Sequence, residues 1–597
     1  MAGRVPARVN RRPSATRAAT VALTVAALAP LAVIPGGTSA FVLGKLLAVA
    51  VAVVVASLAP ASGRLPRTVV VALAAGSCLL LAAALASSAP VAALFGRWPR
   101  YEGLIALPLY LGAGWVGARL LGPESGSRVW ARLHGALSAT AIVMAAFALI
   151  ELTGARPLGG EGLRSGSLQG NATEMGLLGL VVLAVLAPAA LRGRRALVVS
   201  GAVAAGALVA LSGSRAAYVG TLVVLVGLAL LGQGKARRVT GRPLWLASAA
   251  GAGVVTLVLA VPASRERLFA GDTVSGRLAL WSQATALLRD RPLKGAGPSG
   301  YLDASVPYVT LEWVRDVGMR TPPDSPHLWP LQAAAAGGIG LAVLACVTAV
   351  LATVLAVRAW RVAAPERRAE LAGPLVAVLA YGVALLTHFT AGGTTPLVAL
   401  LAGACLAVPT VTPVRVTMRS RAPVLAWRLT GAVLTLTLVA AVVAEWSVAA
   451  GFRSMSRGDV AGVDSAFTTA TRLRPWDADV PSQATQALAA LASAGVPGAA
   501  DACVAWGEVA RRRIPDSMQA GLAYAVGLRL SGDTAAARSE LDRLHARSPY
   551  DSQVLLQRGV LLRTTGDAAG ARADLTRALD LAPGDPVVLR QLDLLDG

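Results

Sequence analysis

The chain has 597 residues, of which 55% are hydrophobic and only 15% are charged, and its mean hydropathy is +0.62. Soluble globular proteins carry about 25% charged residues, so this composition excludes an ordinary soluble enzyme and indicates a polytopic membrane protein. The formal net charge of +23 could point to a nucleic-acid partner, but the distribution of the basic residues argues against that interpretation.

Apolar runs long enough to cross about 30 Å of hydrocarbon recur between Ala18 and Ala450. Because helices satisfy their backbone hydrogen bonds within lipid, the runs predict an all-α membrane bundle of about 12–13 spans. The predicted spans cover residues 18–35, 42–62, 68–95, 104–121, 136–152, 174–191, 196–212, 216–232, 244–262, 328–356, 371–388, 394–411 and 429–449.

The N-terminal tail and every second loop between these spans hold twenty-five Arg and Lys residues, whereas the short loops on the opposite side hold only five. Since basic loops stay in the cytoplasm, this pattern predicts a multi-pass protein of the cytoplasmic membrane whose basic tail, residues 1–17, is cytoplasmic. The first apolar run lacks a convincing cleavage site, so we interpret it as an uncleaved helix. An odd number of crossings then places a large loop, residues 263–327, and everything after residue 450 outside the cytoplasm.

A repeat begins after the last predicted span. Its markers recur at intervals of 34 residues and are Pro515, Pro549 and Pro583, together with Gly532-Asp533 and Gly566-Asp567. This period resembles the tetratricopeptide repeat, and an earlier, less regular copy ends at Pro475. We predict a short α-solenoid over residues 451–597 whose groove docks a partner protein or a glycan; a plain domain of helical hairpins is the alternative.

The outer segment contains a candidate anion site. The residues VSGRLALWSQATALL predict a helix with Ser275 as its N-cap and Arg277 in its first turn, and Trp281 on the same face. A guanidinium group beside the positive end of a helix dipole suits a phosphate group. The structural alternative is an arginine that pairs with Asp272 or lies against lipid headgroups.

Three more arginines lie at predicted outer ends of spans. Arg215 follows Ser214 at the start of a span, where either a functional role or an interfacial anchor is consistent with its depth. Arg97 and Arg100 lie in the loop FGRWPRYEGL, where they either contact a substrate or form an internal ion pair with Glu102.

The loop RPLKGAGPSGY follows the predicted Arg277 helix and is rich in turn-forming residues. Such a loop either approaches a ligand closely or connects two elements. We include Gly297 and Tyr301 from this loop among the candidate substrate contacts.

His327 follows Asp324, Ser325 and Pro326, which predict an N-cap and a proline at the first helical position, with the imidazole in the first turn of the next span. A helix N-terminus disfavours imidazolium, so a neutral imidazole could accept a proton from a sugar hydroxyl, whereas Asp324 acts in the opposite direction. His388, at the outer end of a later span, is the rival, which we interpret as structural. The scattered His and Cys residues show no metal-ligand spacing and there is no P-loop, so we expect no metal and no cofactor.

Five motifs in order, FGRWPRYEGL, SGSLQGNATEMG, SGSRAAYVG, GRLALWSQATALLRDRPLKGAGPSGY and SPHLWPLQAAAAGGIGL, resemble the O-antigen ligase and O-antigen polymerase superfamily over about residues 95–345. The resemblance implies a membrane bundle of the type used by lipid-phosphosugar glycosyltransferases, with a glycan donor on polyprenyl diphosphate. It also implies that Arg215 and Arg277 hold the diphosphate and that His327 positions or deprotonates the acceptor. Where the family usually has Asn after this histidine, the present chain has Leu328.

We therefore predict a glycosyltransferase that moves a lipid-linked glycan to a glycan, lipid or protein acceptor on the outer face of the membrane. A polysaccharide polymerase of the same superfamily is one alternative. A non-enzymatic flippase or scaffold is another, but a flippase should carry charges deep within its spans, where Lys45 is the only obvious example.

Overall fold

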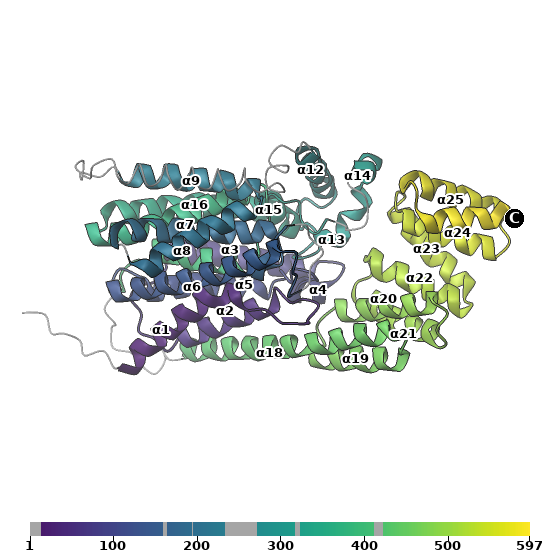
Figure 1. Cartoon of the computed structure of the whole chain (residues 1–597), viewed down its shortest axis with the longest axis horizontal. Helices are drawn as coiled ribbons and strands as arrows, with labels where there is room; N and C mark the ends of the chain where they lie inside the picture. Colours follow the sequence, from purple (N-terminus) through teal and green to yellow (C-terminus); the bar gives the residue numbers. More distant parts are fainter. Residues whose placement is uncertain are drawn as a thin grey trace, which may run out of the picture.

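A computed structural model describes residues 13–158, 164–193, 195–232, 272–316, 323–410 and 422–596. Within these ranges all regular structure is helical, and the only extended pairing is an isolated bridge between Arg64 and Val408. The predicted all-α fold is confirmed. Figure 1 shows a bundle of long helices and, beyond one of its ends, a stack of shorter helices that leads to the C-terminus.

The helices of the bundle are α1 (Pro13–Leu28), η1 (Ala29–Leu31), α2 (Leu43–Ala56), α3 (Arg67–Leu85), α4 (Pro90–Phe95), α5 (Ala106–Leu120), α6 (Ser127–Leu152), η2 (Ser167–Gln169), α7 (Ala172–Gly193), α8 (Ala196–Leu211), α9 (Arg215–Gly232), α15 (Trp329–Val362), α16 (Pro365–Ala384), α17 (Thr395–Leu406) and α18 (Ala422–Ser456). Five of the described helices are long and apolar enough to cross a membrane, namely α3, α6, α7, α15 and the Trp427–Ser456 part of α18.

Other apolar helices, 12 to 20 residues long, occupy the remaining predicted spans. The span predicted over residues 244–262 lies outside the described residues. The span predicted over residues 68–95 is wrong in extent, because α3 ends at Leu85 and α4 starts at Pro90, where proline favours a new helix start.

Glycine allows α5 and α17 to pack closely. A Cβ atom on Gly117 would lie 1.8 Å from the carbonyl oxygen of Leu400, and one on Gly403 would lie 1.8 Å from that of Gly114. These distances leave no room for a side chain, so the two backbones touch directly. Close backbone contact through small residues is a usual way for helices to associate in lipid, where apolar burial contributes little.

The outer segment between α9 and α15 contains α12 (Asp272–Asp290), α13 (Tyr301–Ala304), η3 (Val306–Tyr308) and α14 (Leu311–Asp316). The predicted end of the first of these helices before Pro292 is confirmed. The predicted N-cap at Ser275 is wrong, because the described helix already includes Asp272. Arg277 therefore lies in the second turn of α12 and not in the first. Any anion binding at Arg277 then depends on the charge of its side chain and not on the positive end of the helix dipole.

The C-terminal stack consists of α19 (Val460–Leu473), α20 (Asp479–Ser493), α21 (Ala499–Arg513), α22 (Met518–Ser531), α23 (Thr534–Arg547), α24 (Ser552–Thr564), α25 (Ala568–Leu581) and α26 (Pro586–Asp596). Gly532 and Gly566 adopt the left-handed conformation with φ of 94° and 90°, and the following residues, Asp533 and Asp567, cap α23 and α25 through their side chains. The 34-residue markers thus stand at equivalent turns of successive helix pairs, as the tetratricopeptide pattern predicts.

Helix α18 joins the bundle to this repeat domain without interruption. The division that we predicted at residue 450 lies inside α18 and stays a prediction. On α18, the fully buried Glu445 accepts hydrogen bonds from the Arg474 guanidinium at 2.6 Å and from the Ser39 backbone amide at 2.7 Å. A buried carboxylate needs such partners, so this ion pair fixes the last span to the first repeat and to the loop before α2.

Candidate functional site

The loop between α4 and α5, residues 96–103, carries both Arg97 and Arg100 and is called the arginine loop below. The two ends of this loop lie against each other and form its neck, where both residues are glycines. A Cβ atom on Gly103 would lie 2.1 Å from the Gly96 nitrogen, and Gly96 itself has a φ of 92°. The backbone amide of Leu104 donates to the carbonyl of Ala93 at 3.0 Å just below the neck. Because the neck is this tight, the two arginines extend from one compact loop.

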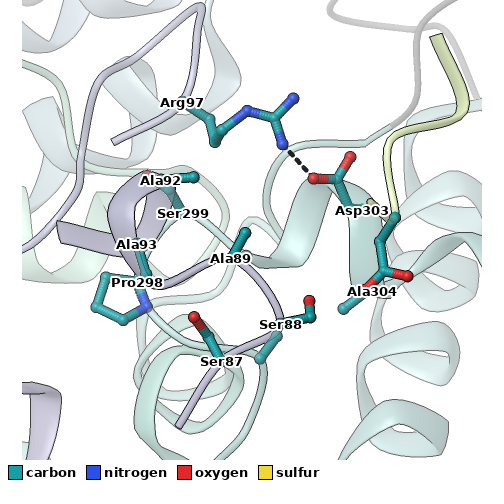
Figure 2. A pocket seen from close by; sticks show the side chains of 13 residues that line it. Ser87, Ser88, Ala89, Ala92, Ala93, Arg97, Pro298, Ser299, Asp303 and Ala304 are labelled. Atoms are coloured by element: carbon teal, nitrogen blue, oxygen red, sulfur yellow. Dashed lines mark hydrogen bonds and ion pairs between the residues drawn. The ribbon is translucent and has the colours of Figure 1, made fainter. Parts of the chain in front are cut away.

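Arg97 is 6% exposed and lies between two carboxylates from distant parts of the chain. Its guanidinium group contacts Asp303 of α13, as Figure 2 shows, and its Nε donates to Asp479 of the repeat domain at 2.8 Å. With carboxylates on both sides, the contacts of Arg97 favour the ion-pair alternative over the predicted contact with a substrate.

Arg100 points to the other side of the arginine loop. Its Nε lies 2.9 Å from the Asp324 carboxylate, and its guanidinium carbon lies 4.5 Å from the centre of the Phe389 ring. Glu102, 3.4 Å from Arg100, also accepts a hydrogen bond from the Thr390 hydroxyl at 2.9 Å. Burial raises the pKa of the Glu102 carboxyl, and Arg100 acts in the opposite direction. The predicted Arg100–Glu102 pair is thus present within a wider cluster.

Residues 323–328, called the histidine turn below, hold His327 in the left-handed conformation with a φ of 53°. The prediction that His327 lies in the first turn of the span is wrong, because α15 begins only at Trp329 and has Pro330 as its second residue. The Ser325 hydroxyl instead accepts a hydrogen bond from the His327 backbone amide at 3.1 Å, which stabilises the turn.

The His327 imidazole lies beside a second histidine. The ring centres of His327 and His388 are 6.1 Å apart, and Phe389 lies against both, at 5.0 Å and 4.1 Å. Nδ1 of His327 and Nε2 of His388 are buried and have no hydrogen-bond partner among the described residues. Buried polar atoms normally have partners, so these two nitrogens are candidates for contacts with a substrate or with water.

Arg277 of α12 acts electrostatically on both histidines. Burial lowers the pKa of the His327 imidazole and that of the His388 imidazole, and the charge of Arg277 lowers both further. Both rings are therefore neutral at physiological pH, and a neutral imidazole is able to accept a proton. The structure thus brings Arg277 and His327 together from elements 50 residues apart.

A break in α15 explains how Arg277 and His327 are held together. Gly337 and Gly338 leave the helical conformation, and the segment after α12, residues 292–297, inserts into the gap. The amide of Ile339 donates to the carbonyl of Pro292 at 2.8 Å, and the amide of Ala296 donates to that of Ala335 at 2.7 Å. Residues 292–297, called the glycine plug below, provide hydrogen-bond partners for backbone groups of the broken helix. They also fix the end of α12 to the helix that follows His327.

Substituting Gly338 by alanine is expected to displace the glycine plug. A Cβ atom there would lie 2.2 Å from the Leu293 carbonyl oxygen, and the φ of 79° is unfavourable for alanine. We expect a loss of roughly 1–3 kcal/mol of stability from the strained backbone alone, measured as the thermal unfolding of the purified protein, and a loss of transfer activity. Gly340→Ala is the matched control, since nothing lies within 4 Å of its Cβ position. Equal effects of Gly338→Ala and Gly340→Ala would contradict the interpretation of the plug.

Arg215 is the first residue of α9, as predicted, and Ser214 caps the helix by accepting a hydrogen bond from the Ala217 amide at 3.3 Å. The start of α9 lies beside the first turn of α7, because a Cβ atom on Gly176 would lie 3.1 Å from the Cβ of Ala217. That turn carries Glu174, whose charge acts on Arg100. Arg215 therefore shares the end of the bundle with the arginine loop and the histidine turn.

The other three predicted substrate contacts lie in packed surroundings. Trp281 packs in an apolar cluster with Trp313 of α14 and with residues of the repeat domain. Gly297 approaches the end of α3, where its Cβ position lies 2.9 Å from the Ser87 Cβ. Tyr301 is 1% exposed, and its hydroxyl donates to the carbonyl of Leu280 at 3.4 Å. These contacts favour structural roles for Trp281, Gly297 and Tyr301, and their roles in binding stay predictions.

Sequence reasoning underestimated two parts of this cluster. His388, which we interpreted as structural, lies next to His327. The sequence feature that could have indicated this is the position of His388 at the outer end of a predicted span. Lys45 is fully buried in α2, and its Nζ donates to the carbonyls of Phe41 at 2.6 Å and Leu168 at 2.8 Å. Its charge and that of Glu174 act on each other, so the charged cluster extends from the arginine loop into the bundle.

Comparison with known protein families covers the part of the chain that carries these residues. The sequence model of the O-antigen ligase family matches residues 200–346, which contain Arg215, Arg277 and His327. No curated protein matches the chain.

Two solved structures are similar to the chain. One is a thermophilic TPR protein of Thermus thermophilus, with 18% identity, a TM-score of 0.23 and coverage of 30% of this chain and 97% of that protein. The other is the APC/C hetero-tetramer Cut9–Hcn1, with 12% identity, a TM-score of 0.22 and coverage of 81% of this chain and 89% of that one. These TM-scores are too low to define how the helices are arranged in space. The repeat assignment therefore rests on the helix pairs of this chain. Residues 200–346 of this membrane protein carry an O-antigen ligase domain, which supports a glycan-transfer role of the ligase or polymerase type in the assembly of envelope glycans.

Proposed function

We propose that the protein transfers a glycan from a polyprenyl diphosphate carrier to an acceptor on the outer face of the cytoplasmic membrane. The observation that carries this proposal is the adjacent pair of imidazoles of His327 and His388, whose ring centres are 6.1 Å apart and on which the charge of Arg277 acts. Both His327 and Arg277 lie within the segment that matches the O-antigen ligase family.

The chemistry of a polyprenyl diphosphate donor fits these groups. An acceptor hydroxyl attacks the anomeric carbon, the bond from that carbon to the phosphate oxygen breaks, and the polyprenyl diphosphate leaves with the bonding electrons. Fixed positive charge from Arg277 and Arg215 would stabilise the negative charge that develops on the diphosphate. The neutral imidazole of His327 would take the proton of the acceptor hydroxyl. The protein mainly has to hold the acceptor hydroxyl in line with the bond that breaks in the donor. This positioning by itself lowers the activation free energy of transfer.

The orientation of the chain supports transfer on the outer face. The basic loops favour a cytoplasmic N-terminus, which would place the arginine loop and the histidine turn at the outer end of the bundle. The repeat domain contacts the same end, through Asp479 and Arg97, and is then also outside. A lipid-linked glycan that has already crossed the membrane would meet the site there.

Mass spectrometry of envelope glycans from cells with and without the gene tests the proposal. We expect the product glycan to be lost from its acceptor and the carrier-linked glycan to accumulate on the outer face. Accumulation of short, unpolymerised units would instead favour a polymerase, in which the acceptor is a second carrier-linked glycan. Accumulation of the donor on the cytoplasmic face would contradict transfer and favour a flippase.

A further inference from the structure

The repeat domain holds the arginine loop directly. The Asp479 carboxylate at the start of α20 binds the loop twice, since one oxygen accepts from Arg97 Nε at 2.8 Å and the other accepts from the Trp98 backbone amide at 2.7 Å. Asp303 contacts the same guanidinium group through Nη1, as Figure 2 shows. Asp479 is 6% exposed, so this carboxylate lies in an interface.

This interface is broad. The Phe95 ring, next to the arginine loop, stacks on Trp476 of the repeat domain with ring centres 5.6 Å apart. Val306 of the outer segment forms one apolar cluster with Leu544 of α23 and Val554 of α24. The repeat domain therefore packs on α4 and on the outer segment that follows α12.

The other side of the arginine loop meets the candidate active site. Arg100, three residues after Arg97, binds the Asp324 carboxylate at 2.9 Å and the Asp324 carbonyl at 2.7 Å. Asp324 belongs to the histidine turn. One compact loop thus connects Asp479 of the repeat domain to the turn that carries His327.

We propose that Asp479 is a positioning residue for the transfer reaction: by binding Arg97 and the Trp98 amide it keeps Arg100, and through Arg100 the histidine turn, in the reactive arrangement. This inference rests on the proposed function and deepens it. It assigns the repeat domain a part in the active site in addition to any docking of an external partner. Displacing a reactive group by about 1 Å can cost roughly 100-fold in rate, so a small loosening of the loop should be measurable.

The test uses the full-length protein in lipid nanodiscs and in cells that lack the gene. Asp479→Asn removes the charge and keeps the shape, Asp479→Glu restores the charge, and Arg97→Gln removes the partner. Asp574→Asn is the matched control, because Asp574 is also buried and binds Arg558 through both oxygens, at 2.6 Å and 2.7 Å, within the repeat domain. Hydrogen exchange reports on residues 96–103 and 323–328, and envelope glycans report on transfer.

We expect Asp479→Asn and Arg97→Gln to speed hydrogen exchange in the arginine loop and the histidine turn, leave α22 to α25 protected, and lower transfer about tenfold. Asp479→Glu should recover part of both effects, and Asp574→Asn should change neither. Unchanged exchange in both segments in Asp479→Asn would overturn the proposal, as would an equal loss of transfer in Asp574→Asn. If the wild type transfers no glycan, the proposed function fails, while the exchange measurement still decides whether Asp479 holds the loop.

Discussion

Replacing Arg277 by alanine is expected to lower glycan transfer by about 100- to 1000-fold, the range found when a group that stabilises developing negative charge is removed. Arg277 acts more strongly than Arg100, the other arginine that acts on both imidazoles, so its charge lies near the place where the diphosphate would have to bind if His327 takes the acceptor proton. The measurement is the yield of the envelope glycan, together with binding of polyprenyl diphosphate to the purified variant.

Arg289→Ala is the control for this substitution, since Arg289 is an exposed residue in the last turn of the same helix. It should transfer at the wild-type rate. Arg277→Lys keeps the charge but loses the planar, two-pronged group that matches phosphate, so we expect it to recover only part of the activity. Full activity in Arg277→Ala would show that the diphosphate binds elsewhere.

The spans and the repeats could be predicted because each depends on a pattern along the chain. Hydropathy located apolar helices in the predicted spans that the structure describes, although α3 ends at Leu85 rather than at residue 95 and α6 begins at Ser127 rather than at residue 136. The 34-residue spacing of Pro515, Pro549 and Pro583 located the helix pairs. Boundaries were less certain, because a local cap signal competes with packing. Ser325 and Pro326 predicted an N-cap and the first helical position, yet the helix starts three residues after Pro326, at Trp329.

The candidate site was predictable only in part, because its contacts join residues far apart in sequence. Arg97 and Asp479 are separated by 382 positions, and no local pattern indicates that a repeat domain would neutralise this arginine. The glycine plug shows the same limit. The motifs around Gly295 and Gly338 were both recognised, but the insertion of one into the broken helix of the other depends on backbone hydrogen bonds that leave no trace in side-chain composition.

Replacing His327 by alanine is expected to reduce transfer by about 10²- to 10⁴-fold, the usual contribution of a general base. The comparison that isolates this role is His388→Ala, which removes the neighbouring imidazole from the same aromatic cluster. If both variants fold and only His327→Ala loses transfer, the proton acceptor is His327. Loss in His388→Ala with retention in His327→Ala would reverse the assignment.

The pH dependence gives an independent check on the same residues. Burial, Arg277 and the neighbouring His388 lower the pKa of His327 to about 2, and burial and Arg277 lower that of His388 to about 3, against 6.5 for an ordinary histidine. Protonation of His327 should therefore not limit transfer between about pH 5 and 8. In Arg277→Ala the pKa of His327 should rise, because a positive neighbour is gone, and the acid limit of the residual activity should move to higher pH.

The same shifts determine how stability depends on pH. Below pH 6.5 the unfolded chain binds protons at both histidines while the native protein does not, so their contribution to stability is present above pH 6.5 and is lost as the pH falls toward the native values. The glutamine variants His327→Gln and His388→Gln, which cannot titrate, should each lose less thermal stability than the wild type between about pH 7.5 and 5. Equal losses in the wild type and both variants would show that folding leaves the pKa of these imidazoles at its ordinary value, which contradicts the lowering by burial and by Arg277.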